Sequence, residues 1–306
     1  MTGRIVVLGI FAADATFRAD RAPVMGETLV GNSFSLGPGG KGSNQAVAAA
    51  RAGGDVHFIS RLGRDVFADL AFQTWKDAGV SPVIRQLGEV PTGAASIFVE
   101  ETTGNNAIIV CPGAAGEISQ EDVEENSDLI EGASVFLTQL EQPMDAAIRG
   151  LQMAKAAGAI TILNPAPATE LPKETFPLCD YITPNESEAE GLTGIVVSDL
   201  SSAERAADAL LELGVGTALI TLGENGVLLR SRNETLHVEA TAAGEVVETT
   251  AAGDAFNGGF AVALAEGKGS EAAVRFGCAT AGISVTRPGA AASMPTRAEV
   301  DSFLGS

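Results

Sequence analysis

Residues 249–259 read TTAAGDAFNGG, a stretch that combines small side chains with a single carboxylate. Two alanines and a glycine leave backbone amides uncovered where a helix is expected to begin. Amide N–H groups at a helix N-terminus, with the positive end of the helix dipole, form a ready anion site. Asp254 lies at the mouth of that site, where it could take a proton from a hydroxyl group attacking the anion. An anion site beside a base is the apparatus that phosphoryl transfer needs.

The helix expected after this stretch has a regular apolar spacing. Phe256, Phe260 and Leu264 recur every four residues, which is typical of one buried helix face. A simpler interpretation of Asp254 is that it only caps this helix after a glycine turn, because Asp is a favoured N-cap residue. The catalytic and capping interpretations predict different surroundings for the carboxylate.

A second glycine-rich stretch, GPGGKGSNQ at residues 37–45, precedes an alanine-rich helix predicted over residues 46–52. It matches the GxGxxG pattern of dinucleotide-binding oxidoreductases, but in those proteins the loop follows the first strand and an acidic residue ends the second. Here Asp55 precedes the apolar run 56–59. A Walker loop is excluded because Gly42 stands where Ser or Thr is needed. Rather than a simple hairpin end, we interpret the stretch as backbone that closely approaches a polar ligand, with Lys41 and Asn44 as donors.

The composition limits the class of protein. The 306 residues are 45% hydrophobic and include 36 glycines, which suits a compact chain with many tight turns. The formal net charge of −20 argues against nucleic acid as a partner, since phosphates attract Lys and Arg. The three cysteines are widely spaced and form no CxxC motif, so neither a disulfide framework nor a zinc site is indicated.

The N-terminus superficially resembles a signal peptide. Its apolar run covers only residues 5–13, contains Gly9 and leads directly to Asp14 and Arg18. A buried strand that ends in a functional turn explains this pattern better. No stretch approaches the length of a membrane span, so we expect a soluble, cytoplasmic protein.

From residue 56 onward, short apolar runs alternate with helical patterns. This alternation predicts an α/β fold with a mainly parallel central sheet that is covered by helices on both faces. Polar or glycine residues follow the expected strands: Asp14, Glu141, Asn164, Asn185 and Gly223. Ligands of open α/β sheets bind beyond the carboxyl ends of the strands, so we expect these residues to surround a site.

Two β-rich segments, near residues 15–36 and 93–111, do not fit the alternation. We assign them to a small second sheet that could act as a lid. The predicted organisation is one α/β domain over residues 1–306, with the lid inserted at about 13–38 and 90–112.

Seven segments carry a resemblance to a known family. They are GPGGKGSNQAVAAARAG (37–53), LEQP (140–143), NPAPA (164–168), TPNESEAEGLTG (183–194), ITLGENGV (220–227), AAGDAFNG (251–258) and VTRPGA (285–290). Through them the sequence resembles the ribokinases of the PfkB carbohydrate-kinase family over nearly its whole length. A Gly-Gly-Lys-Gly-x-Asn-Gln motif followed later by Ala-Ala-Gly-Asp is a far more specific signal than either motif alone.

The resemblance implies a role for each matching residue around the sugar. Asp254 would be the base on the primary hydroxyl group of the sugar. The anion hole would be made by the amides of Ala251, Ala252 and Gly253. The sugar would be held by Asp14, Gly40, Lys41, Asn44, Glu141 and Asp254.

The resemblance also implies the cofactors ATP, Mg²⁺ and K⁺. Asn185 and Glu188 would lie near the phosphates and order Mg²⁺ and its waters. Alternatively, both could simply cap a helix and lie on its surface without binding a ligand. The nucleotide would further be bordered by Thr221, Gly223, Gly226 and Gly253. The monovalent-cation site would comprise Glu248, Thr250, Ser284, Arg287, Gly289 and Ser293.

Three positions depart from the family pattern. Ala12 stands where ribokinases usually have an Asn that contacts the sugar, which bears on substrate identity. Glu248 stands where they usually have Asp, so the charge of the cation site is kept. Cys278 stands where some members place a His near the adenine.

The resemblance thus implies an ATP-dependent kinase that phosphorylates the 5-hydroxyl of D-ribose to ribose 5-phosphate. Alternatives are kinases for another pentose, a ketose or a deoxy sugar, and less so a nucleoside kinase. A non-catalytic sugar-binding protein would keep the glycine-rich loop but would not need Asp254 or the Asn185–Glu188 pair. The family resemblance further implies a homodimer that pairs through the lid sheets.

Overall fold

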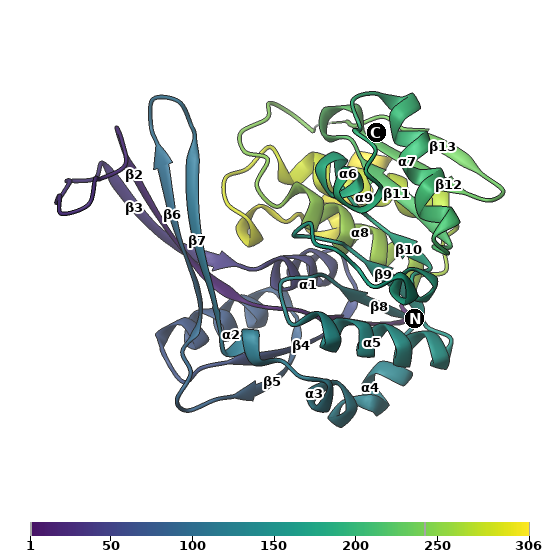
Figure 1. The fold of residues 1–306 in the computed structure, drawn as a ribbon, viewed down its shortest axis with the longest axis horizontal. Coiled ribbons are helices and arrows are strands. Elements are labelled where there is room, and N and C mark those ends of the chain that lie inside the picture. The colour runs from purple at the N-terminus through teal and green to yellow at the C-terminus, as the bar shows by residue number, and fades with distance from the viewer. Residues whose placement is uncertain (1, 242, 306) are drawn as a thin grey trace.

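The computed structural model describes residues 2–241 and 243–305, and these residues form two β-sheets flanked by helices (Figure 1). The larger sheet has the strand order β13-β12-β11-β10-β9-β8-β1-β4-β5. Its strands are β1 (Arg4–Leu8), β4 (Asp55–Leu62), β5 (Ser81–Gln86), β8 (Val135–Thr138), β9 (Ile160–Leu163), β10 (Tyr181–Ile182), β11 (Thr217–Thr221), β12 (Val227–Ser231) and β13 (Thr235–Val238). All neighbours are parallel except β11–β12 and β12–β13. The predicted mainly parallel sheet is confirmed.

Helices cover both faces of this sheet. One face carries α1 (Lys41–Arg51), α2 (Val66–Ala78), α8 (Ala252–Ala265), α9 (Ser270–Ser284) and α10 (Arg297–Leu304). The other carries α3 (Gln120–Glu125), α4 (Ser127–Glu131), α5 (Met144–Ala157), α6 (Glu186–Thr193) and α7 (Leu200–Glu212). Successive side chains of β1 join opposite cores, with Ile5 and Val7 on the α1 side and Val6 and Leu8 on the α5 side. A strand covered on both faces explains the continuous apolar run near the N-terminus.

The remaining elements are short. The 3₁₀ turns are η1 (Ala114–Glu117), η2 (Lys173–Leu178), η3 (Gly223–Asn225) and η4 (Ala291–Ser293). Across residues 2–241 and 243–305, every helix is too short or too polar to cross a membrane.

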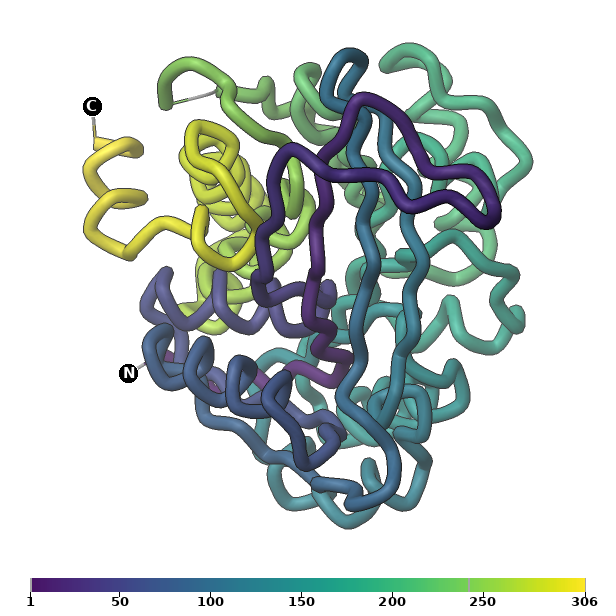
Figure 2. Tube along the Cα trace, turned by 90° about the vertical axis from the view of Figure 1, so that its left-hand side faces the viewer, coloured from purple at the N-terminus to yellow at the C-terminus, as the bar shows by residue number. Residues whose placement is uncertain are grey.

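The predicted second sheet is present and projects away from the helix-covered body (Figures 1 and 2). Its strands, in spatial order, are β3 (Ser33–Gly39), β2 (Ala12–Ala19), β6 (Thr92–Glu100) and β7 (Asn106–Gly113). Residues 20–32, in the middle of the β-rich segment predicted near 15–36, lie outside its strands. Because only three residues separate β1 from β2, the small sheet starts directly at the carboxyl end of the large one.

The start of α1 differs from the prediction. The helix begins at Lys41 and not at Ala46, so the GKGSNQ segment forms its first turns. Gly40 makes this possible with a φ of 87°, and a Cβ atom there would lie 2.6 Å from the Ile10 carbonyl oxygen. The chain therefore turns sharply at Gly40, next to Ile10 in the segment after β1. It passes from β3 into α1 without a longer loop.

Helix α8 is buried all round and not on one face only, since every residue from Asp254 to Leu264 is buried. It packs closely against α1 at Gly258, where a Cβ atom would lie 2.5 Å from the Ala48 side chain and 2.8 Å from the Gln45 carbonyl oxygen. This close approach brings the two glycine-rich motifs of the sequence together.

Candidate active site

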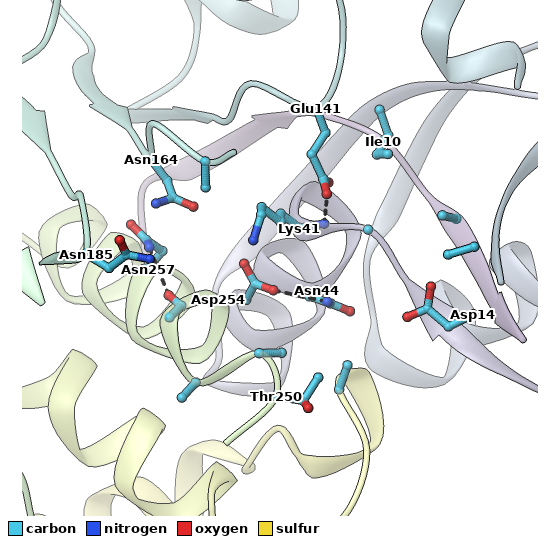
Figure 3. Close-up of a pocket in the computed structure, with 18 of the residues that line it drawn as sticks. Ile10, Asp14, Lys41, Asn44, Glu141, Asn164, Asn185, Thr250, Asp254 and Asn257 are labelled. Atoms are coloured by element: carbon cyan, nitrogen blue, oxygen red, sulfur yellow. Dashed lines mark hydrogen bonds between the residues drawn. The ribbon is translucent and has the colours of Figure 1, made fainter. Parts of the chain in front are cut away.

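A pocket of about 360 Å³ opens beyond the carboxyl ends of the central strands, between α1, α8 and the small sheet (Figure 3). It gathers most of the residues singled out in the sequence: Asp14, Gly40, Lys41, Asn44, Glu141, Asn185, Glu188, Thr221, Thr250, Ala251, Ala252, Gly253 and Asp254. These residues come from distant parts of the chain. Their convergence agrees with the rule that ligands of α/β sheets bind at this edge.

Asp254 lies in the first turn of α8, and its side chain is only 6% exposed. The N-cap position is held by Ala251, so the interpretation of Asp254 as a simple capping residue is wrong. Asn44 Nδ2 donates to Asp254 Oδ2 at 3.1 Å, and Gln45 Nε2 donates to Oδ1 at 2.9 Å. The carboxylate is thus held by two donors from α1.

The turn that leads into α8 has an unusual backbone. Ala251 adopts a left-handed conformation with φ 61°, which is uncommon for a residue with a side chain and tends to occur at functional sites. The first helical bond runs from the Ala255 N–H group to the Ala251 carbonyl at 2.9 Å. The amides of Gly253 and Asp254 precede that bond and lie at the positive end of the helix dipole.

One member of the predicted anion hole is engaged elsewhere. The Ala252 N–H group donates to the Thr249 carbonyl oxygen at 3.2 Å, because the left-handed turn folds this amide back on the preceding loop. The structure therefore offers Gly253 and Asp254, in place of Ala252, as amide donors to an anion.

Four carboxylates and one ammonium group dominate the electrostatics of the pocket. Burial raises the pKa of Glu141 to about 7 and that of Asp14 to about 6. Burial also raises the pKa of Asp254 and of Glu188. Burial lowers the pKa of Lys41, but the charges of Asp254, Glu141 and Glu188 outweigh this effect and leave it raised. The charged form of Lys41 is therefore favoured, whereas burial disfavours the charged forms of the four acids around it.

The polar groups at the small-sheet end suit a ligand with several hydroxyl groups. Glu141 Oε2 accepts a hydrogen bond from the backbone N–H of Lys41 at 2.7 Å. Asn44 Oδ1 is buried, and no donor among the described residues reaches it. Buried acceptors are normally paired, so this oxygen fits a hydroxyl group of a ligand. A side chain at Gly39 would overlap the carboxylate of Asp14, so the glycine leaves room for it.

Asn185 and Glu188 form a capping box at the start of α6. The Asn185 N–H donates to Glu188 Oε2 at 2.9 Å, and the Glu188 N–H donates to Asn185 Oδ1 at 2.8 Å. The expected helix cap is present, and both residues also line the pocket. A bridge between Asn185 and Thr221 ties α6 to the end of β11. Carboxylate and amide oxygens here are the hard donors that Mg²⁺ prefers.

Of the three predicted nucleotide glycines, Gly253 lines this pocket, whereas Gly223 and Gly226 do not. Gly223 and Gly226 bracket the η3 turn directly after β11, both with positive φ values of 53° and 87°. Glycine suits this turn because other residues rarely adopt that conformation. Gly223 is exposed near Thr221, which does line the pocket, whereas Gly226 is buried.

The predicted cation-site residues come from two segments, 248–250 and 284–293, and the Glu248 N–H donates to the Val285 carbonyl oxygen between them at 3.2 Å. Glu248 Oε2 accepts from the Gly289 N–H at 2.8 Å, which joins the first segment to the turn after α9. In the same turn the Arg287 N–H donates to the Ser284 carbonyl at 3.1 Å, and Ser293 Oγ donates to the Ala290 carbonyl at 2.8 Å. A carboxylate and backbone carbonyls are the kind of oxygen donor that an alkali cation takes, and both segments carry such donors. Within the described chain, no group of three or more His, Cys, Asp and Glu side chains could hold a metal.

Several pocket residues had no role assigned from the sequence. Asn257 Nδ2 donates to the Gly253 carbonyl at 2.9 Å, and Thr183 Oγ1 donates to Asn257 Oδ1 at 2.8 Å. The inner face of the small sheet contributes Ala95, Ile97, Ile108 and Val110. Alternating apolar residues in the β6 and β7 segments are the only sequence signal that could have identified this wall.

Comparisons with known proteins agree with this geometry. A sequence profile of the pfkB family carbohydrate kinases matches residues 2–297. The chain is 40% identical over 305 residues to a ribokinase of Haemophilus influenzae, covering 99% of both proteins. It is 33% identical to a deoxyribokinase of Salmonella typhi, covering 98% of both. The structure of Arabidopsis thaliana ribokinase complexed with ribose and ATP superimposes with a TM-score of 0.93 at 33% identity, covering 99% of both chains.

Proposed function

Because the chain belongs to the pfkB family of carbohydrate kinases, we propose that it is a ribokinase that transfers the γ-phosphoryl group of ATP to the 5-hydroxyl of D-ribose. The products are ribose 5-phosphate and ADP. The single observation that carries this proposal is a buried Asp254 at the start of α8, in one pocket with Asp14, Lys41 and Glu141. Similarity to ribokinases over nearly the full length supports ribose as the acceptor.

The sugar binds at the small-sheet end of the pocket. Asp14 and Glu141 accept hydrogen bonds from its hydroxyl groups, Lys41 donates, and the Asn44 side chain offers its unpaired Oδ1. Gly40 lets the backbone approach the sugar closely. Bound in this way, the 5-hydroxyl points to the carboxylate of Asp254.

Asp254 removes the proton of the 5-hydroxyl while the sugar oxygen forms its bond to the γ-phosphorus of ATP. The bond from that phosphorus to the bridging oxygen breaks, and ADP leaves with the electron pair. Negative charge on the transferring group is stabilised by the Gly253 and Asp254 amides and by the α8 dipole. Positioning and electrostatic stabilisation supply most of the catalysis in such transfers.

The nucleotide lies along Thr221 and the glycine turn at Gly223 and Gly226. Asn185 and Glu188 would hold Mg²⁺, which would neutralise phosphate charge when bound. The Glu248 carboxylate would hold K⁺, and its charge would favour order in the loop that leads to the Gly253 amide. If so, K⁺ raises turnover and Glu248→Ala abolishes that response; activity that is indifferent to the monovalent cation would contradict the site.

Ala12 supports a second candidate acceptor, a sugar altered at one hydroxyl group such as 2-deoxyribose. This side chain lines the pocket, is 3% exposed and offers no hydrogen bond to a hydroxyl group. The similarity to a deoxyribokinase points in the same direction.

The deciding experiment is a coupled ADP-release assay over ribose, 2-deoxyribose, arabinose, xylose, fructose and a nucleoside. We expect the highest kcat/KM with ribose. Release of ADP that no sugar stimulates would contradict the kinase assignment. Sugar binding without any ADP release would instead support a non-catalytic sugar-binding protein.

We further propose one kinase domain with an inserted lid, acting in the cytoplasm as a homodimer. All three cysteines are free thiols, the state that a reducing compartment maintains.

On the outer face of the small sheet, Phe17, Phe34 and Leu36 are 48%, 58% and 45% exposed. Exposed apolar faces of this kind mark interaction surfaces. Light scattering should report a dimer that Phe34→Glu converts to a monomer; a monomeric wild-type protein would contradict the proposal.

A further inference from the structure

A cluster of uncharged amide side chains lies beside Asp254. These side chains are almost completely buried, so contact with solvent does not explain why they are polar. Gln45 and Gln139 are 0% exposed, and Gln142 and Asn164 are 3% and 7% exposed. Burial of an amide is unfavourable unless its donors and acceptors are paired. The arrangement of this cluster therefore has a structural or functional cause.

The hydrogen bonds of the cluster give Gln45 one orientation. Asn164 Nδ2 donates to the Thr183 carbonyl at 3.0 Å, so Asn164 Oδ1 faces Gln45 and accepts from its Nε2 at 3.0 Å. On the other side, Gln139 Nε2 donates to Gln45 Oε1. The second hydrogen of the Gln45 amide donates to Asp254 Oδ1 at 2.9 Å. A flipped Gln45 would turn its oxygen towards two other acceptors, Asn164 Oδ1 and Asp254 Oδ1.

Two glycines make room for Gln139. A side chain at Gly9, just after β1, would overlap Gln139 Oε1, and a Cβ atom at Gly42 in α1 would lie 2.8 Å from it. Larger residues at either position would push Gln139 away from Gln45. Three separate parts of the chain thus have matching shapes that keep this amide in contact with Gln45.

We propose that Gln45, held in turn by Gln139, is a positioning residue for Asp254. Its amide fixes Oδ1 and so leaves Oδ2, beside Asn44, directed at the acceptor hydroxyl of the sugar. A neutral donor orients the carboxylate without adding a positive charge that would weaken it as a base. This inference rests on the proposed kinase function and goes beyond it by naming what orients the base.

The same bond bears on the ionisation of Asp254. Burial raises its pKa, while Lys41, Gln45 and Asn44 each lower it. The other charged groups that face the pocket are Asp14 on β2, Glu141 after β8 and Glu188 on α6, all of which are acids. Loss of the Gln45 bond should therefore raise the pKa of Asp254 further.

The test compares three variants that each replace one buried amide with a thioether of similar length. Gln45→Met removes the donor to Asp254, and Gln139→Met removes only the group that orients Gln45. Gln142→Met is the matched control, because Gln142 donates to Thr138 Oγ1 and the Gln139 carbonyl and not to Gln45 or Asp254. For each protein, kcat and both KM values are measured from pH 5 to 9, together with the melting temperature.

We expect Gln45→Met to lower kcat at pH 7 roughly 10- to 100-fold with little change in either KM. The midpoint of the acid limb of kcat should rise by about one pH unit, the effect of losing a hydrogen bond to a charged group. Gln139→Met should act in the same direction but less strongly. Gln142→Met should lower the melting temperature without moving the midpoint.

An equal loss of kcat at every pH in all three variants would overturn the inference, since it would show a merely structural role. So would a Gln45→Met enzyme with an unchanged kcat and midpoint. If Gln45→Met does not fold, Gln139→Met decides, and an unchanged midpoint in that variant overturns the inference. A wild-type protein that phosphorylates no sugar would overturn the proposed function as well, so the two failures differ.

Discussion

The two walls of the pocket are built in opposite ways. The wall formed by α1 and α8 is buried and polar, and its side chains are already hydrogen-bonded, as the contacts of Asp254 with Asn44 and Gln45 show. Apart from Asp14 on β2, the wall formed by the small sheet is apolar and open, with Ile108 and Val110 52% and 50% exposed. The first wall belongs to the core of the molecule, whereas the second projects from it (Figure 1).

This difference indicates that the two walls have different roles, one in the chemical step and one in covering the ligand. Groups that move protons and stabilise charge act best when they are preorganised in a site with little water, as on the α1–α8 wall. An apolar wall with half-exposed residues gains burial only when a ligand or a partner covers it. We therefore expect changes in the first wall to affect kcat and changes in the second to affect KM.

The largest effect is expected from Asp254→Asn. Loss of the general base should lower kcat by roughly 10²–10⁴-fold while sugar and ATP binding stay largely intact. Calorimetric titration with each ligand, run beside the kinetic assay, separates the two effects. A fall in kcat of less than tenfold would mean that Asp254 is not the base.

Ala12, where β2 leaves the core, joins the two walls. A residue that bonds a substrate hydroxyl can reject an analogue lacking it by roughly 10⁴–10⁵, and Ala12 forms no such bond. We expect ribose to be preferred over a relative altered near Ala12 by only about 10²-fold or less in kcat/KM. Ala12→Asn should sharpen the preference, measured over the same sugar panel. A wild-type preference above roughly 10⁴ over every analogue would contradict this account.

Glu141→Gln tests the energetic cost of a buried carboxylate that follows β8 and bonds the first residue of α1. The pKa of Glu141 is raised to about 7, so the folded state binds more protons than the unfolded state between about pH 4.5 and 7. Its contribution to stability therefore falls as pH rises through that window. Glu141→Gln should raise the free energy of unfolding by about 1–3 kcal/mol at pH 8 and leave it unchanged at pH 4.

Urea denaturation at both pH values measures this effect, with Glu131→Gln on the exposed side of α4 as a control. The same substitution should weaken sugar binding, because a neutral amide accepts hydrogen bonds less strongly than a carboxylate. If the difference in free energy of unfolding between Glu141→Gln and the wild type is the same at both pH values, the buried Glu141 carboxylate does not destabilise the fold as proposed.

The smallest effect is expected on the small sheet. Ile108→Ser removes apolar contact area from the inner face and should raise the KM for the sugar roughly three- to tenfold with kcat nearly unchanged. Ile109→Ser is the matched control, since its side chain lies on the opposite face of the same strand. Equal KM values for the two variants would mean that the inner face does not cover the substrate.

Much of the fold follows from local patterns in the sequence. The fully buried strand at Ile5–Leu8 and the helix ended by Gly158 were predictable, because burial on both faces and left-handed glycine caps leave clear signatures. The start of α1 was not, because Gly-Gly-Lys-Gly resembles a loop until the turn at Gly40 is seen against Ile10. The short helices α3 and α4 and the edge strand β5 carry too little periodicity to predict.

The candidate site shows the same limit. Asp254 was predictable from its own neighbours, as a carboxylate after small residues at a helix start. The contact of Gln45 with Asp254 depends on how closely α1 and α8 pack at Gly258, a distance that no local pattern encodes. The engagement of the Ala252 amide likewise follows from the left-handed turn at Ala251, which the sequence TTAAGD does not reveal.

The most direct measurement is a ¹H–³¹P correlation spectrum of the product that the protein forms from ribose and ATP. We predict a sugar phosphate whose phosphorus couples to the two protons on C5, formed by the wild-type protein and at least tenfold more slowly by Asp254→Asn. Phosphorus coupled to another carbon's proton, or inorganic phosphate and ADP without any sugar phosphate, would contradict the account.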